Sequence, residues 1–263
     1  MPHAKKRLGQ HFLSDPRILA RIADALAATP RDTVLEIGPG RGGLTEALAS
    51  RGARLVVIEK DRDLVPSLRE RFPGVRVVEA DALEADWHQL VGSGTFLVAG
   101  NIPYNITSPL IDKALTPPRP ARIVFLLQKE VAERLAARPG TRDYGALTVG
   151  VRTVATVERL FTVPAGAFQP RPKVDSAVVR LTPLTAPLLP DAEIPAFRPF
   201  VVGLFGFRRK QLSRGLRELT HRPAQEVARW LEAVRLSGSL RPAELSPSDF
   251  VQLHRRLASA GVG

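Results

Sequence analysis

The sequence of 263 residues contains no cysteine, and this absence excludes several kinds of chemistry at once. Without a thiol the chain forms no disulfide framework, no thiolate metal site and no cysteine nucleophile. No apolar run approaches the roughly 18 residues of a membrane span. The basic N-terminus also lacks the apolar core and small-residue cleavage site of a signal peptide. We therefore expect a soluble, cytoplasmic protein that uses neither a membrane nor a metal.

Asparagine and tyrosine are scarce as well. The chain has two asparagines, Asn101 and Asn105, and two tyrosines, Tyr104 and Tyr144. Three of these four residues lie within one pentapeptide, Asn-Ile-Pro-Tyr-Asn. A bias of base composition or a hot habitat accounts for the scarcity elsewhere but not for this cluster. The pentapeptide is therefore the first candidate for a functional site.

Acidic residues are outnumbered by basic ones, 26 against 38, which gives a net charge of +12. Such a balance favours a polyanionic partner, and nucleic acid over a membrane because no basic amphipathic segment stands alone. An arginine-rich surface without a specific partner is the alternative. Apolar residues make up 44% of the chain, enough for a sizeable core.

Short apolar runs alternate with helical patterns through the first half of the chain. This alternation is typical of βαβ units and a parallel sheet buried on both faces. We expect two later segments, Ala146–Val157 and Ser176–Leu181, to close the sheet as a hairpin-like pair. The five expected strands are Thr33–Ile37, Leu55–Ile58, Val75–Val78, Phe96–Ala99 and Ile123–Leu127.

The composition changes near residue 184, where five prolines fall between Thr182 and Pro199. This stretch indicates a domain boundary. We predict a first domain over residues 1–184 and a small helical domain over residues 185–263. Its expected helices are Phe200–Leu219, Gln225–Val234 and Phe250–Leu257.

A glycine loop follows the first expected strand. Gly38, Gly40 and Gly43 match the pattern G-x-G-x-x-G between a strand and a helix, which permits a tight turn and close approach of a ligand. Glu59 ends the second strand, placed to accept hydrogen bonds from ribose hydroxyls. Asp81 ends the third strand, within reach of an adenine amino group.

Glu36 indicates which nucleoside the loop binds. It lies two positions before Gly38, where its carboxylate would repel a diphosphate but suit a ligand with an ammonium and a sulfonium. That ligand is S-adenosylmethionine. The alternatives are a tight turn for the glycines, a helix cap for Asp81 and a surface ion pair for Glu59. Three strand-end acids around one glycine loop argue against a chance arrangement.

The pentapeptide suits chemistry on an exocyclic base amine, whose lone pair is delocalised into the ring. The side-chain oxygen of Asn101 and a backbone carbonyl would accept hydrogen bonds from the amine and expose its lone pair. Pro103 stiffens the turn, and Tyr104 offers a flat face to an unstacked base. A turn with an asparagine cap is the alternative. Phe168 would supply a second face, or simply fill the core.

Seven motifs together resemble one family, the small-subunit ribosomal RNA adenine dimethyltransferases or KsgA family, over nearly the whole chain. The pair G-Q-H-F-L and N-I-P-Y is quite specific, whereas the glycine loop alone is not. The motifs are Gly9–Leu13, Glu36–Leu44, Asn101–Tyr104, Gln128–Glu130, Tyr144-Gly145, Phe168–Ser176 and Phe207–Lys210.

The resemblance implies a class I methyltransferase domain, with a Rossmann-like, seven-stranded and mostly parallel sheet, followed by a small all-α domain. It implies transfer of two methyl groups from S-adenosylmethionine to N6 of each of two adjacent adenosines in the 3′-terminal hairpin loop of 16S rRNA. The partner would be the immature small ribosomal subunit, and the chain would act in its biogenesis. We expect a monomer.

The resemblance also implies roles for individual residues. Asn101 would contact both cofactor and target amine beside Pro103, and Tyr104 and Phe168 would sandwich the adenine. The remaining cofactor-site residues would be His11, Leu13, Glu36, Gly38, Gly40, Glu59, Lys60, Asp81 and Ala82. The expected RNA contacts are Lys5, Lys6, Arg7, Arg171, Lys173, Arg208, Arg209, Lys210, Arg214 and Arg217.

Three of these basic residues, Lys210, Arg214 and Arg217, are expected on one helical face. Two alternatives stay open at this point. One is the related large-subunit methyltransferase that confers macrolide resistance, against which the G-Q-H-F-L form and the basic C-terminal segment argue. The other is a non-catalytic assembly factor of the same fold, against which the intact Asn101–Tyr104 and Glu59 argue.

Overall fold

The protein is described here from a computed structural model that covers Lys5 and residues 9–262. The chain forms two compact units. The first contains the residues up to 132 together with residues 157–183, and the second contains residues 133–156 and 184–263. The second unit therefore includes a segment, residues 133–156, that the sequence places in the first domain.

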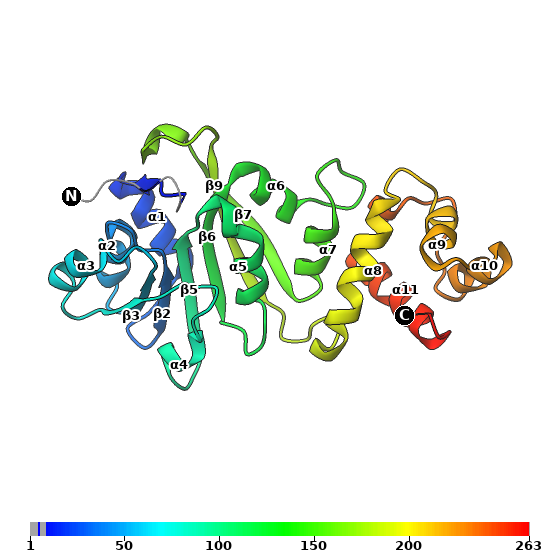
Figure 1. The fold of residues 1–263 in the computed structure, drawn as a ribbon, viewed down its shortest axis with the longest axis horizontal. Helices are drawn as coiled ribbons and strands as arrows, with labels where there is room; N and C mark the ends of the chain where they lie inside the picture. Colours follow the sequence, from blue (N-terminus) through cyan, green and yellow to red (C-terminus); the bar gives the residue numbers. More distant parts are fainter. Residues whose placement is uncertain (1–4, 6–8, 263) are drawn as a thin grey trace. The chain divides into compact units, whose positions relative to one another are not determined.

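The first unit is built on a seven-stranded sheet with the order β4-β3-β2-β5-β6-β9-β7 (Figure 1). Neighbours from β4 to β6 are parallel, whereas β9 is antiparallel to β6. This confirms the expected α/β class with a mostly parallel sheet. The strands are β2 Thr33–Ile37, β3 Arg54–Glu59, β4 Arg76–Glu79, β5 Phe96–Asn101, β6 Arg122–Gln128, β7 Ala155–Val163 and β9 Ser176–Pro183.

The chain reverses direction across the sheet at β2, which lies between β3 and β5. Connections leave the carboxyl ends of β2 and β5 on opposite sides, and such a switch point is where open α/β sheets bind ligands. The central strands are apolar on both faces because helices cover both. Val34, Val57 and Val98, for example, are fully buried.

Local sequence signals explain the helices of this unit. The side chain of Asp15 accepts hydrogen bonds from the backbone N–H groups of Arg17 and Ile18, and Pro16 fills the first turn of α1. Helix α1 packs on α2 and on the sheet. The helices are α1 Pro16–Leu26, α2 Gly43–Ala49, α3 Val65–Arg71, α4 Trp87–Val91, α5 Thr107–Ala114 and the first half of α6 Lys129–Ala136, whose second half belongs to the second unit, with 3₁₀ turns η2 Tyr104–Ile106 and η3 Ala165–Ala167.

A second, two-stranded sheet fixes the N-terminal segment. Strand β1, Phe12–Leu13, pairs antiparallel with β8, Phe168–Gln169. Both residues of β1 are buried. The segment that carries the G-Q-H-F-L motif is therefore part of the folded first unit.

The second unit is helical, as expected, and its core is apolar. Phe197, Leu204, Trp230 and Phe250 are among the buried members of one hydrophobic cluster. Its helices, drawn from green (α7) through yellow to red in Figure 1, are α7 Ala146–Arg152, α8 Ile194–Gly206, α9 Leu212–Thr220, α10 Ala224–Ala233 and α11 Pro247–Ser259, with 3₁₀ turns η4 Asp191–Glu193 and η5 Pro242–Glu244.

The expectation of a strand over Ala146–Val157 is wrong for its first part, which forms helix α7. The Thr148 hydroxyl donates to the carbonyl of Arg134 and accepts from the Gly145 N–H, which orders the first turn. Val149 packs into the core of the second unit. Tertiary burial thus outweighs the weak strand preference of the β-branched residues. The strand β7 begins only at Ala155.

The expected helix Phe200–Leu219 is also interrupted, between Gly206 and Leu212. The Arg208 guanidinium donates to the carbonyls of Thr141 and Arg142 within the same unit, which holds the intervening turn. Lys210 therefore precedes α9. Of the three basic residues expected on one helical face, only Arg214 and Arg217 lie on α9.

We predict that Tyr144→Phe destabilises the second unit. The Tyr144 ring is fully buried and its hydroxyl donates to the carbonyl of Leu245 at 2.7 Å. Its removal leaves a buried carbonyl without a donor, which costs about 1–3 kcal/mol. Urea unfolding measures the loss. The control Ser259→Ala removes an exposed hydroxyl from a helix carbonyl and should change stability by less than about 0.5 kcal/mol. Equal stabilities of Tyr144→Phe and wild type would contradict the prediction.

Candidate active site

The functional residues expected at the strand ends do gather at one edge of the sheet. Ile37, the last residue of β2, lies level with Ile58 of β3 and with Gly100 of β5. Glu59 and Asn101 each follow by one residue. A cavity of about 170 Å³ opens at this edge. Its walls include all ten predicted cofactor residues: His11, Leu13, Glu36, Gly38, Gly40, Glu59, Lys60, Asp81, Ala82 and Asn101.

The glycine loop forms the floor of the cavity with a backbone that other residues adopt with strain. Gly38 and Gly40 have φ of +66° and +58°. A Cβ on Gly40 would also lie 2.9 Å from the ring of Phe12. Glycine is required at position 40 for both reasons.

Glu59 ties this loop to the next strand. One of its carboxylate oxygens accepts the Gly40 N–H at 3.0 Å and the other accepts the Asp61 N–H at 2.7 Å. The residue is only 5% exposed, and burial raises the pKa of its carboxyl despite these two donors. The Lys60 N–H is a further donor to this carboxylate. Because two carboxylate oxygens offer about four acceptor positions, Glu59 can still accept from ligand hydroxyls.

Glu36 is more deeply buried, at 1% exposure. Burial raises the pKa of its carboxyl to about 8, although the Thr45 hydroxyl donates to it at 2.7 Å. The neighbouring Glu59 raises the pKa of Glu36 further. A cation in the cavity would offset the cost of a negative charge on Glu36 in this buried position. The sequence predicts such a cation, the ammonium or sulfonium of the ligand.

Asp81 lies beside Lys60 at the third strand end. Its carboxylate accepts from Lys60 Nζ at 2.5 Å and from the backbone N–H of Leu83 at 2.9 Å. Burial raises the pKa of Asp81, but the hydrogen bonds from Lys60 and Leu83 and the charges of Lys60 and Lys113 together outweigh it, and the pKa lies below its ordinary value. Ala82, the next residue, is buried.

Asn101 is held by a contact that the sequence does not reveal. Its amide Nδ2 donates to the backbone carbonyl of His11 at 2.8 Å. The carbonyl oxygen of the same amide accepts no hydrogen bond within the described part of the chain, Lys5 and residues 9–262. Asn101 therefore offers a fixed acceptor beside the cavity, whose wall also includes Pro103 and Tyr104.

The ring of Tyr104 is covered by His11 rather than by Phe168. The His11 and Tyr104 rings stack with centroids 5.6 Å apart and an angle of 28° between planes. The Tyr104 hydroxyl bonds Ser176 at 2.8 Å. Phe168 is 5% exposed, packs in the core of the first unit and is not part of the cavity wall. Its role as a second aromatic face stays a prediction.

The predicted RNA contacts fall into three groups. Lys6 and Arg7 lie outside the described residues, and Lys5 forms ion pairs within the first unit. Arg208 is half-buried and bonds backbone carbonyls. The remaining side chains are exposed: Arg171 and Lys173 in the first unit, and Arg209, Lys210, Arg214 and Arg217 in the second.

The residues at the cavity fit S-adenosylmethionine. Three carboxylates of graded burial line the wall, and the glycine loop presents backbone without side chains at the cavity through Gly38 and Gly40. Within the described residues no group of three or more His, Asp or Glu side chains forms a metal site. No helix in that same part of the chain is long and apolar enough to cross a membrane.

Two residues of the site were missed by sequence reasoning. Asp61 is buried two positions after Glu59 and donates its N–H to it, and Gln10 bonds the Asp61 side chain. The only signal for Gln10 was its place in the G-Q-H-F-L motif. Asp61 gave no signal, because an acid after a strand is ordinarily exposed.

The chain is similar to known proteins over nearly its full length. It matches the family described as "Ribosomal RNA adenine dimethylase" over residues 1–257. It is 44% identical to "Ribosomal RNA small subunit methyltransferase A" of Pseudomonas aeruginosa, which covers 97% of this chain and 95% of the relative. The protein of the same name from Marinobacter nauticus is 41% identical, with 98% and 93% covered.

Two solved structures are similar as well. A dimethyladenosine transferase from Plasmodium falciparum superposes with a TM-score of 0.85 at 27% identity, covering 96% of this chain and 99% of the other. The 23S rRNA methyltransferase ErmE superposes with a TM-score of 0.73 at 33% identity, covering 94% and 99%.

We predict that Glu36→Gln removes a pH dependence of stability. The folded chain holds a proton on Glu36 up to about pH 8, whereas the unfolded chain loses it near 4.5. The folded state binds more protons in this window, so its stability falls as the pH rises from 4.5 to 8. Glutamine has no such proton, and the variant should be more stable at pH 8 by on the order of a few kcal/mol.

Urea unfolding between pH 4 and pH 9 tests this difference. The curve of the exposed control Glu46→Gln should run parallel to that of wild type. If the Glu36→Gln curve also runs parallel to wild type, Glu36 is ionised in the folded protein and the prediction is wrong.

Proposed function

The chain belongs to the ribosomal RNA adenine dimethylase family, and from this premise we propose that it dimethylates N6 of two adjacent adenosines in the 3′-terminal hairpin loop of 16S rRNA. It has the class I methyltransferase fold and is an S-adenosylmethionine-dependent rRNA adenine methyltransferase. The observation that carries the proposal is the position of Asn101–Tyr104 at the rim of an acid-lined cavity.

Within the cavity we assign the acids by their place on the strands. Glu59 would accept from the ribose hydroxyls, and Asp81 from the adenine amino group. Glu36 and the glycine loop would hold the amino acid end. S-adenosylmethionine supplies, when bound, a methyl group made electrophilic by its positive sulfur. The buried carboxylates favour that positive charge because little water competes with them.

Asn101 would act on the target amine. Its free side-chain oxygen accepts one N–H of adenine N6 and holds the amine still. The Pro103 carbonyl already accepts the Ile106 N–H at 3.1 Å. We therefore assign the second acceptor to the Ile102 carbonyl, one residue earlier. Two acceptors on the N–H groups draw the lone pair out of conjugation with the ring. The proton leaves for water after transfer, so no general base is needed.

Tyr104 would orient the base. Its hydroxyl is fixed by Ser176, and the ring stands at the cavity with His11 on one face. A flipped adenine would stack on this ring and gain about 1–3 kcal/mol. The exposed basic side chains of both units would bind RNA phosphates, with an affinity that falls as salt rises. We assign the immature small subunit as substrate particle, the cytoplasm as location and a monomer without metal as the acting form.

The large-subunit methyltransferase is less well supported. The relatives from Marinobacter nauticus and Pseudomonas aeruginosa are named for the small subunit and are 41% and 44% identical to this chain, against 33% for the 23S rRNA methyltransferase ErmE. A non-catalytic assembly factor is also disfavoured. Such a binder would gain nothing from Glu36, a buried acid that lowers its stability at neutral pH.

We expect Asn101→Ala to lose methyl transfer while keeping most cofactor affinity. The change removes the acceptor for the target amine, and kcat should fall by about 10²–10³-fold. It also removes the donor to the His11 carbonyl, so cofactor affinity should weaken, by less than about tenfold. Methyl transfer to immature small subunits and calorimetric titration with S-adenosylmethionine measure the two effects. Unchanged turnover would remove Asn101 from the mechanism.

The substrate itself is tested by mapping dimethyladenosine in both ribosomal RNAs by mass spectrometry, with and without this protein. We expect two adjacent dimethylated adenosines near the 3′ end of 16S rRNA that appear only when the protein is present. Modification of 23S rRNA would support the large-subunit alternative instead. Cofactor binding without any modification would support an assembly factor.

A further inference from the structure

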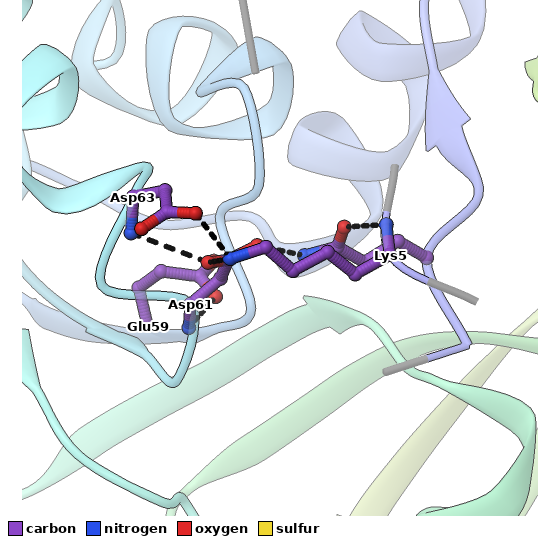
Figure 2. Close-up of polar contacts among 5 residues, drawn as sticks. Lys5, Glu59, Asp61 and Asp63 are labelled. Carbon is purple, nitrogen blue, oxygen red and sulfur yellow. Dashed lines mark hydrogen bonds and ion pairs between the residues drawn. The ribbon is translucent and has the colours of Figure 1, made fainter. Parts of the chain in front are cut away.

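A lysine that contacts RNA phosphates would extend into solvent. Lys5 instead forms ion pairs with two acids beside the cavity, Asp61 and Asp63 (Figure 2). Its Nζ lies 2.5 Å from a carboxylate oxygen of Asp61 and 2.5 Å from one of Asp63. The side chain of Lys5 is 25% exposed and that of Asp61 only 1%. The Asp61 end of the ion pair is therefore shielded from solvent, whereas the Lys5 end is partly exposed.

Gln10 completes the contact from the same segment. It donates to the second oxygen of Asp61 at 2.9 Å and accepts the backbone N–H of Lys5 at 2.8 Å. Both oxygens of this buried carboxylate are thus bonded to the N-terminal segment. Burial raises the pKa of Asp61, but the hydrogen bonds from Lys5, Gln10 and the Asp63 N–H, together with the charge of Lys5, outweigh it and the pKa lies below its ordinary value.

The contact connects directly to the cofactor site. The Asp61 N–H donates to Glu59, and the other oxygen of Glu59 accepts from the glycine loop (Figure 2 shows Glu59 beside Asp61). On the other side, residues 9–13 form one wall of the cavity. This wall is held at its far end by the bond from Asn101 to His11 and by the pairing of β1 with β8.

We propose that Lys5, Gln10 and Asp61 form a latch that holds residues 9–13 as a wall of the cavity, which makes Lys5 a positioning residue for S-adenosylmethionine rather than an RNA contact. The proposal rests on the cofactor assigned above. Without Lys5, a buried carboxylate remains beside Glu59 with one partner fewer. Gln10 and the Asp63 N–H still bond this carboxylate, but its positive counter-ion is gone. Such an uncompensated buried charge is strongly unfavourable, and the segment relieves it by detaching to let water reach Asp61.

Cofactor affinity gives the first test, by calorimetric titration of the full chain with S-adenosylmethionine. If the wall is in place in about a tenth of Lys5→Met molecules, the apparent Kd rises about tenfold. The KM for the cofactor should rise with it, while kcat at saturating cofactor stays within about twofold of wild type. Lys5→Arg keeps the charge and should restore the affinity to within a few-fold.

The matched control is Arg31→Met. It removes the same charge from an exposed side chain of the first unit outside the cavity wall, and should leave cofactor affinity unchanged. Hydrogen exchange without cofactor gives a second, activity-independent test. Amides of residues 9–13 should exchange faster in Lys5→Met and Asp61→Asn than in wild type or Arg31→Met.

The outcomes distinguish a failure of the latch from a failure of the proposed function. If Lys5→Met binds cofactor and exchanges like wild type but binds RNA less tightly, Lys5 is a phosphate contact and the latch is refuted. If wild type itself fails to bind S-adenosylmethionine, the proposed function fails. The exchange comparison still decides in that case whether the latch holds the segment.

Discussion

The buried carboxylate of Glu59 is the contact on which the site depends. It accepts from the glycine loop on one side and from Asp61 on the other, and so fixes the ends of β2 and β3 relative to each other. Asp61 in turn holds Lys5 and Gln10. Floor and wall of the cavity are thus connected through Glu59 and Asp61, and a change at either residue affects the other because both carboxylates are buried.

This arrangement concentrates negative charge in a region with little solvent. The pKa of Glu36 and that of Glu59 are both raised. For Glu36, burial is the main cause and repulsion from Glu59 raises the pKa further. The site without its ligand is therefore held by protonation of Glu36 and by backbone donors. A positively charged ligand replaces the proton, so that part of the binding free energy comes from an acid that was unfavourable before. Glu36 therefore makes the cavity favour positively charged ligands.

Local sequence patterns predicted the sheet because each strand is encoded by its own apolar run, and they placed Glu59 and Asn101 at the strand ends. They failed where a distant partner decides. Ala146–Arg152 is helical because Val149 is buried in the second unit. Lys5 reads as a basic arm until Asp61, far along the chain, is placed against it. The periodicity of apolar residues indicates which face of a segment is buried, but it does not indicate which distant residue that face contacts.

The two ends of one amide explain why asparagine is required at position 101. Its N–H₂ holds the His11 carbonyl, and its oxygen remains for the target amine. Aspartate would set two acceptors against each other at His11, and would add a negative charge next to Glu36 and Glu59. Glutamine carries the same groups on a longer arm and could not keep both positions with the backbone of β5 fixed by β6. The asparagine therefore joins the wall to the chemistry: the bond that places residues 9–13 also aims the acceptor. When the cofactor binds against that wall, it also fixes the Asn101 oxygen that accepts the N–H of the target adenine.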